Sequence, residues 1–228
     1  MTGYTDKHEY TNKNGVTSVV YLMDCMKAME QMGDKEFGLA CVDPPYGGND
    51  AIGLKDNSGL KRQSAKRSAY KGFSNVQPKP KYFSELKRVS IHQIIWGVNF
   101  YKGIDLSGGR ICWDKKGTAF GRAELAYYSG SKSVNVVELV WNGMLQHDMK
   151  DKEDRIHPTQ KPIALYDWIF KNYAKPHDTI FDSHCGSGSS RIAADRANLP
   201  YVATELDPDY FRDHCKRFDR YTSQLTIF

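Results

Sequence analysis

Short apolar runs recur along the chain and predict its strands. Seven runs have the length and composition of buried or half-buried strands, at residues 16–25, 36–46, 92–100, 108–115, 134–141, 178–184 and 201–207. The run "EFGLACVDPPY" is almost continuously apolar up to Asp43. Such a run is typical of a strand covered on both faces of a parallel sheet.

Segments with helical spacing separate these runs. They predict helices at 26–33, 82–90, 162–174, from Ser189 or Ser190 onward, and at 208–224. Asp207 and Pro208 suit the N-cap and first position of the last helix. Alternating strands and helices predict one doubly wound α/β domain over residues 1–228.

Two stretches lack either pattern. Residues 47–81 are rich in Gly, Ser, Lys and Asn and predict a long loop, a kind of segment that is usually a lid, a binding loop or disordered. Residues 142–156 are polar and mixed in charge, and we expect a linker or surface hairpin there.

Composition adds limits on setting and chemistry. No apolar run reaches membrane-spanning length, and the first residues lack the basic-then-apolar pattern of a secretory signal, so we expect a cytoplasmic protein. The five cysteines form no Cys-x-x-Cys pair, so reduced thiols are expected rather than disulfides or a metal site.

The net charge of +5 is concentrated in the long loop. Between residues 47 and 81 only Asp50 and Asp56 oppose eight basic residues, which are Lys55, Lys61, Arg62, Lys66, Arg67, Lys71, Lys79 and Lys81. One basic loop on a nearly neutral body indicates either a local contact with a polyanion or a solvated loop without a partner.

A glycine-rich turn near the C-terminus predicts a cofactor site. In "IFDSHCGSGSSRIAADR" a strand ends at Asp182, Gly186 and Gly188 follow, and a helix begins. This order brings a ligand close to backbone at a helix N-terminus. Glu205 ends the next strand, at the distance from which an acidic side chain holds ribose hydroxyls. A tight turn without a ligand is the alternative, because the third glycine of the nucleotide-binding pattern is Arg191 here.

The motif "DPPY" (43–46) predicts a second site. Two prolines make the backbone stiff and leave its carbonyls free to accept hydrogen bonds. A carboxylate beside such a carbonyl suits an –NH2 group with two protons, and Tyr46 adds a flat face for stacking. The pattern indicates a pocket for the amino edge of a planar base, although a plain proline turn would also fit.

Together these motifs resemble the β-class amino DNA methyltransferases, which methylate adenine N6 or cytosine N4, including those borne by phages and prophages. "DPPY" precedes "FDSHCGSG", as in that class, and "YLMDC", "HPTQKP" and "ELDPDYF" are similar to further cofactor segments. The resemblance covers most of residues 17–215. It implies S-adenosylmethionine as cofactor and the class I methyltransferase fold, a Rossmann-like, mostly parallel sheet of about seven strands with one antiparallel, in permuted motif order.

The resemblance also assigns roles to residues. It places Asp43, Pro44, Pro45 and Tyr46 at the reacting amino group. It places Asp24 and Cys25 at the adenine of the cofactor and Glu205 at its ribose. Around the methionine portion and its carboxylate it places Asp182, Gly186, Gly188, Thr159 and Lys161, with His184 and Cys185 in the same loop. Where the family often has Pro-Phe after the aspartate, this chain has Ser183-His184. His184 therefore suggests an imidazole wall, a general base or a tolerated loop residue, and Cys185 also suits a small packing residue.

From the resemblance we expect double-stranded DNA as partner and direct in-line methyl transfer to a flipped-out adenine. Lys61, Arg62, Lys66, Arg67 and Lys71 would grip the backbone, and residues 130–156 would form a short recognition segment. Cytosine N4 remains an alternative target, and an inactive DNA-binding regulator an alternative class. The setting would be restriction–modification, a phage or a solitary enzyme, and the protein would be a monomer or homodimer.

The last residues, Gln224–Phe228, read "QLTIF" and are similar to the peptide that binds the bacterial sliding clamp. The alternative is an amphipathic tail that docks on its own domain.

Overall fold

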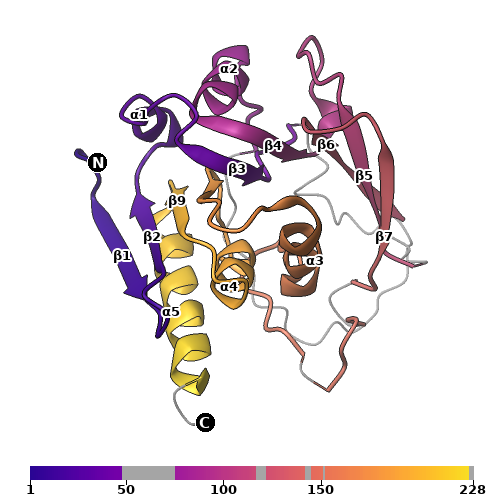
Figure 1. The fold of residues 1–228 in the computed structure, drawn as a ribbon. Helices are drawn as coiled ribbons and strands as arrows, with labels where there is room; N and C mark the ends of the chain where they lie inside the picture. Colours follow the sequence, from indigo (N-terminus) through magenta and orange to yellow (C-terminus); the bar gives the residue numbers. More distant parts are fainter. Residues whose placement is uncertain (48–74, 117–121, 142–144, 151, 226–228) are drawn as a thin grey trace, which may run out of the picture.

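The computed structural model describes residues 1–47, 75–116, 122–141, 145–150 and 152–225. Nine strands of these segments form one sheet in the order β1-β2-β9-β8-β3-β4-β6-β5-β7 (Figure 1). The strands are β1 (Asp6–Thr11), β2 (Thr17–Leu22), β3 (Phe37–Val42), β4 (Ser90–Trp96), β5 (Gly109–Asp114), β6 (Ala123–Tyr128), β7 (Val134–Glu138), β8 (Ile180–Asp182) and β9 (Tyr201–Glu205).

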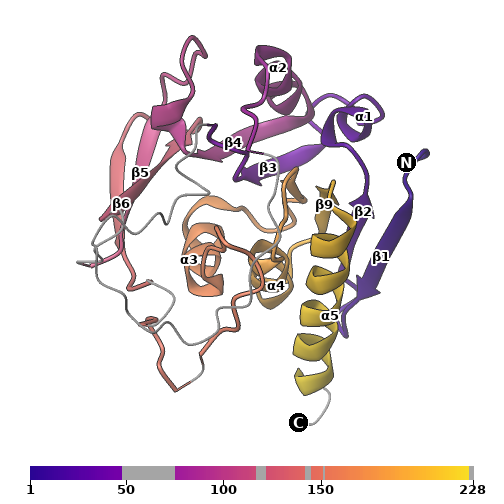
Figure 2. The same ribbon diagram turned by 180° about the vertical axis from the view of Figure 1, so that it is seen from behind.

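The helices cover both faces of this sheet. They are α1 (Cys25–Met29), α2 (Pro80–Val89), α3 (Ile163–Tyr173), α4 (Ser189–Arg196) and α5 (Pro208–Leu225), with a 3-10 turn at Val98–Phe100. α1 and α2 lie together, and α3, α4 and α5 form a second group, as both views show (Figures 1 and 2). Each group packs a separate apolar core against the sheet, and Ile94 and Ile95 of β4 belong to opposite cores.

The predicted fold class is confirmed, with two more strands than expected. β1 pairs antiparallel with β2, and β6 runs antiparallel between β4 and β5, while the other pairs are parallel. β1 escaped the sequence pattern because it is an edge strand that alternates exposed and half-buried residues. β6 begins with three residues that are not buried, so its apolar signal is short.

The central strands determine where the site lies. β2, β9, β8 and β3 are parallel neighbours, so their carboxyl ends share one edge of the sheet. Asp24, Asp43, Asp182 and Glu205 stand at or just after these ends. Because β3 lies beside β8, the early "DPPY" motif and the late glycine loop meet.

The predicted recognition segment does not form a separate unit where the structure describes it. Residues 134–138 are β7, which extends the sheet beside β5. The following stretch is tied to the body: the side chain of Gln146 bonds to both backbone groups of Glu153, and the Glu153 carboxylate accepts from Ile163 N and Arg217. No helix among the described residues is long and apolar enough to cross a membrane.

Candidate active site

A cavity of about 700 Å³ lies at the carboxyl ends of the parallel strands. This volume lies within the range of small-molecule sites. Twelve of the predicted site residues line it, and they are Asp24, Cys25, Asp43, Pro44, Pro45, Tyr46, Thr159, Lys161, His184, Cys185, Gly186 and Glu205. Residues that the sequence did not single out complete the wall, among them Tyr82, His157, Gln160, Tyr166, Leu206 and Tyr210.

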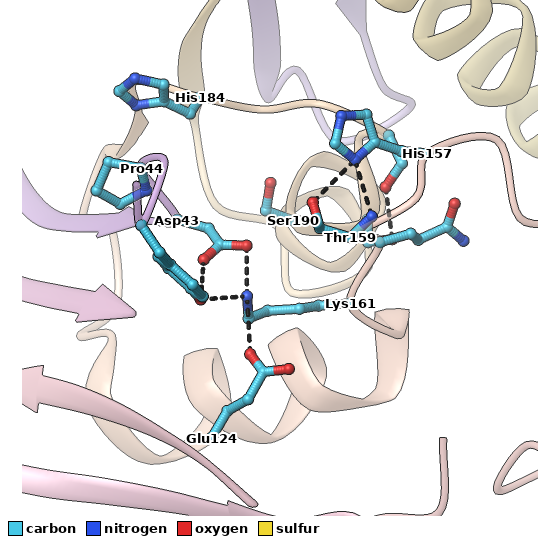
Figure 3. Close-up of polar contacts among 12 residues, drawn as sticks. Asp43, Pro44, Glu124, His157, Thr159, Lys161, His184 and Ser190 are labelled. Atoms are coloured by element: carbon cyan, nitrogen blue, oxygen red, sulfur yellow. Dashed lines mark hydrogen bonds and ion pairs between the residues drawn. The ribbon is translucent and has the colours of Figure 1, made fainter. Parts of the chain in front are cut away.

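The acceptors of the "DPPY" motif are engaged by donors of the chain itself (Figure 3). The Tyr46 hydroxyl donates to Asp43 Oδ1 at 2.5 Å, and the Lys161 ammonium donates to Asp43 Oδ2. The buried Tyr101 hydroxyl donates to the Pro44 carbonyl at 2.7 Å. These contacts fix the carboxylate and carbonyl in position before any substrate arrives.

Tyr46 is held as a flat wall. Its ring stacks on Phe100 with centroids 4.9 Å apart and planes 12° from parallel. The backbone of Gly97 passes under the same ring, since a Cβ there would stand 2.2 Å from Tyr46 Cε1. Burial, and then the Asp43 charge, raises the pKa of Tyr46 well above its usual value, so the phenol remains a donor.

The structure places the Lys161 ammonium at Asp43, and its expected contact with the carboxylate of the cofactor stays a prediction. Its side chain is 4% exposed, and its ammonium lies between Asp43 and Glu124 rather than beside the glycine loop. Burial would lower the pKa of Lys161, but Asp43 and Glu124 together raise it. Glu124 also pairs with Lys115; burial alone would raise its pKa, and the two lysines lower it to about 2.

Sequence reasoning missed Glu124. It stands in β6, the strand that was not predicted, and it does not line the cavity. The one available signal was a charged residue at the start of the apolar run "AELAYY".

Two residues predicted at the cofactor, Asp182 and Gly188, do not line the cavity. Asp182 is buried; its carboxylate accepts from the Ser190 hydroxyl at 2.7 Å and from His184 N at 3.1 Å. Burial raises the pKa of Asp182 to about 7, although these hydrogen bonds lower it in part. Gly188 has φ +76°, and a Cβ there would stand 2.8 Å from the buried His214 ring. Both residues therefore stabilise the conformation of the glycine loop without facing the cavity.

Gly186 and Glu205 form the polar floor of the cavity. Gly186 has φ +48°, and its N–H donates to Glu205 Oε2 at 3.0 Å. The other oxygen, Oε1, accepts from the N–H groups of Leu206 and Asp207 at 2.9 Å each. Three backbone donors hold this carboxylate in one orientation and leave it acceptor capacity.

His184 belongs to a hydrogen-bonded chain of side chains. The Ser183 hydroxyl bonds to both the Tyr82 hydroxyl, at 2.6 Å, and His184 Nδ1, at 2.8 Å. Burial lowers the pKa of His184 to about 4, so the imidazole is neutral at pH 7 and a weak proton acceptor. This environment favours a wall residue over a general base.

His157 and Thr159 form another part of the cavity wall. The Thr159 hydroxyl lies 3.0 Å from His157 Nδ1, and the His157 ring meets the edge of Tyr210 with centroids 4.3 Å apart. Burial lowers the pKa of His157 to about 4, with Lys161 as a further cause.

The predicted DNA contacts Lys61, Arg62, Lys66, Arg67 and Lys71 lie outside the described residues. Within the described residues, no group of three His, Cys, Asp or Glu side chains could hold a metal ion.

Comparison with known proteins agrees with this arrangement. Solved structures share the fold: the M1.HpyAVI–SAM complex has a TM-score of 0.54 at 16% identity, covering 87% of this chain and 98% of that one. The cytosine-N4-specific PvuII DNA methyltransferase has a TM-score of 0.60 at 14% identity, covering 95% and 90%. The fold is thus the Rossmann-like fold of S-adenosylmethionine-dependent methyltransferases.

Sequence comparison finds relatives for part of the chain. Residues 114–216 match the family model N6_N4_Mtase, described as DNA methylase. The chain is 30% identical over 81 residues to the type II methyltransferase M2.LlaDCHI of Lactococcus lactis subsp. cremoris, which is 36% of this chain and 30% of that protein. It is 32% identical over 59 residues to YubD of Escherichia coli (strain K12), 26% of each chain. Residues 114–216 are therefore similar to the N6/N4 DNA methylases, and the chain spans less than a third of the length of these two curated relatives.

Proposed function

We propose that this protein transfers a methyl group from S-adenosylmethionine to the N6 amino group of adenine in DNA. The observation that carries the proposal is the single cavity in which "DPPY", from residues 43–46, shares a wall with the glycine loop from residues 183–187. Direct methyl transfer requires that the base amine and the cofactor bind next to each other, and residues suited to each of them line this one cavity.

The residues present fit the cofactor. The backbone at Gly186 borders the cavity without a side chain, and the nearest group to a Cβ there would be the His157 ring at 3.9 Å. Glu205 retains acceptor capacity for ribose hydroxyls, and Asp24 and Cys25 line the cavity for the adenine. When bound, S-adenosylmethionine supplies an electrophilic methyl group.

Asp43 and Pro44 act on the amino group. An exocyclic amine is a poor nucleophile because its lone pair is delocalised into the ring. If the Asp43 carboxylate and the Pro44 carbonyl accept its two N–H bonds, the nitrogen moves towards tetrahedral geometry and its lone pair becomes available. Tyr101 and Tyr46, which already donate to these acceptors, keep them aimed at the site. Stacking on Tyr46 would hold the base plane.

The preference for adenine rests on the first residue of the motif. Cytosine-N4 members of the family more often carry Ser where this chain has Asp43, so cytosine N4 is the second candidate. An inactive DNA-binding regulator is disfavoured, because Asp43, Tyr46, Gly186 and Glu205 are all present and line one cavity.

Labelled methyl donor, unmethylated DNA and digestion to nucleosides test the proposal. We expect labelled N6-methyladenine; labelled N4-methylcytosine would select the second candidate, and no labelled nucleoside would contradict both. Asp43→Ala should abolish product while S-adenosylmethionine still binds, because the amine acceptor is lost and Asp24, Cys25, Gly186 and Glu205 are unchanged. Full activity of that variant would contradict the mechanism.

We further propose that the basic loop, residues 47–81, binds the DNA backbone next to the flipped-out base. We expect the protein to act in the cytoplasm. Replacing Lys61, Arg62, Lys66 and Arg67 together by Gln should weaken DNA binding and flatten its salt dependence, since each phosphate contact releases counterions. Titrations at two salt concentrations measure both effects. Unchanged affinity at both would contradict the role.

A further inference from the structure

Lys161 contacts the carboxylate that is proposed to accept the reacting amine. A carboxylate or carbonyl oxygen has a second lone pair, so Tyr46 and Tyr101 can keep their hydrogen bonds while a base amine joins them. The Lys161 ammonium is different, because it is a full positive charge in direct contact with Asp43 Oδ2, and its side chain is only 4% exposed. It competes with the amine for the Asp43 carboxylate, and it repels the positive charge that develops on the amine during transfer.

A second acceptor is already within reach of Lys161. Glu124 Oε2 lies 3.2 Å from the ammonium, on the side away from Asp43 (Figure 3). This oxygen is buried and accepts no well-aligned hydrogen bond from the described part of the chain, whereas Oε1 is bound by Lys115. The rings of Trp96 and Tyr46 lie 5.2 and 5.6 Å from the ammonium, so a short movement would keep it over aromatic faces.

We propose that Lys161 is a cation that passes from Asp43 to Glu124 when the target amine enters, and that Glu124 is the positioning residue that receives it. The proposal rests on the proposed function, because it assumes an amine substrate at Asp43. Glu124 acts only through Lys161, since it does not line the cavity.

The role predicts a distinctive pH profile for a variant without the Glu124 charge. Burial lowers the pKa of Lys161, and the raising effects come from Asp43 and Glu124. Other ionisable groups that interact with Lys161 are Tyr46, Cys41 and His157. Tyr166 and Lys115 interact with its partner Glu124. Without Glu124, burial is opposed by Asp43 alone, so Lys161 loses its proton at a lower pH. The neutral amine then releases Asp43, and activity recovers as pH rises.

The experiment compares Glu124→Gln with a matched control, Glu85→Gln. Glu85 is also a half-buried, ion-paired carboxylate (20% exposed, against 25% for Glu124), but it pairs with Arg88 in α2 and does not line the cavity. At pH 7 we expect Glu124→Gln to lower kcat on the order of ten-fold. Calorimetry should show unchanged S-adenosylmethionine affinity, and kcat should recover towards pH 9. Glu85→Gln should follow the wild type in all three measurements.

A shorter carboxylate covers the case in which Glu124→Gln does not fold. Glu124→Asp keeps the negative charge but places it farther from the Lys161 ammonium. We therefore expect a smaller loss of kcat, and no recovery of kcat at high pH. Wild-type kcat for either variant at every pH would overturn the inference, as would weakened cofactor binding with normal kcat. Wild-type protein that methylates no DNA would overturn the proposed function and this inference together.

Discussion

A comparison of Gly188 in the glycine loop with Gly103 in a distant turn separates backbone strain from close packing. Gly188 and Gly103 both have positive φ, +76° and +73°, but a Cβ would collide with His214 only at Gly188. Gly103→Ala should lower the free energy of unfolding by about 1–2 kcal/mol, the cost of a left-handed alanine. Gly188→Ala should cost at least about 1 kcal/mol more, since overpacking adds to strain. Urea unfolding measures both, and equal losses would contradict the packing role.

Some residues of the site could be predicted from the sequence, and others could not. Motifs identified Asp43, Tyr46, Gly186 and Glu205 because each needs a particular residue type next to a strand end, and all four line the cavity. The partner of Lys161 could not be read in this way. It depends on β6 packing beside β4, which brings Glu124 to a lysine 37 positions further along the chain.

Elements were predictable where both faces are buried. All six residues of β3 are buried, and its continuous apolar run indicated that strand. β1 is an edge strand with four exposed residues, and only Ala126 and Tyr127 of β6 are buried, so neither gave a sustained pattern. Half-buried strands are held by pairing with their neighbours, which local sequence does not record.

The last helix bears on the proposed clamp contact. α5 continues through Leu225, so the first two residues of "QLTIF" are helical, and Gln224 lines a second cavity beside Trp141 and Tyr221. For a clamp-binding peptide, removal of residues 224–228 should abolish binding to a bacterial sliding clamp and leave the melting temperature unchanged. A lower melting temperature with undiminished clamp binding would show instead a tail that docks on its own domain.

At the scale of the whole molecule, the strand order explains why a glycine loop near the C-terminus lies beside a motif near the N-terminus. Cavity position depends on which strands are neighbours, and β3 pairs with β8 although 137 residues separate the last residue of β3 from the first of β8. The order of the two motifs along the chain can therefore be exchanged without moving the cavity. The order of the strands in the sheet determines where the cavity lies.

Stability of the whole molecule should depend on the neutral histidines around this cavity. Burial lowers the pKa of both His157 and His184 to about 4, below the value of about 6.5 expected in the unfolded chain. The unfolded state thus binds more protons between pH 6.5 and 4, and stability is lost as pH falls through that window. Asp182 acts in the opposite direction, because its raised pKa favours the folded state at low pH and that contribution is lost as pH rises towards 7.

Replacing His184 by Phe, the residue that the family often carries, isolates one of these contributions. The lost hydrogen bond to Ser183 costs the same at every pH, but the proton penalty exists only in acid. Relative to wild type, the variant should therefore gain at most about 2 kcal/mol in free energy of unfolding between pH 8 and pH 5, as expected for one imidazole shifted by two to three units. Urea unfolding of both proteins at the two pH values measures the difference. An identical difference at pH 8 and pH 5 would contradict the lowered pKa of His184, because it would mean that the imidazole is protonated as readily in the folded protein as in the unfolded chain.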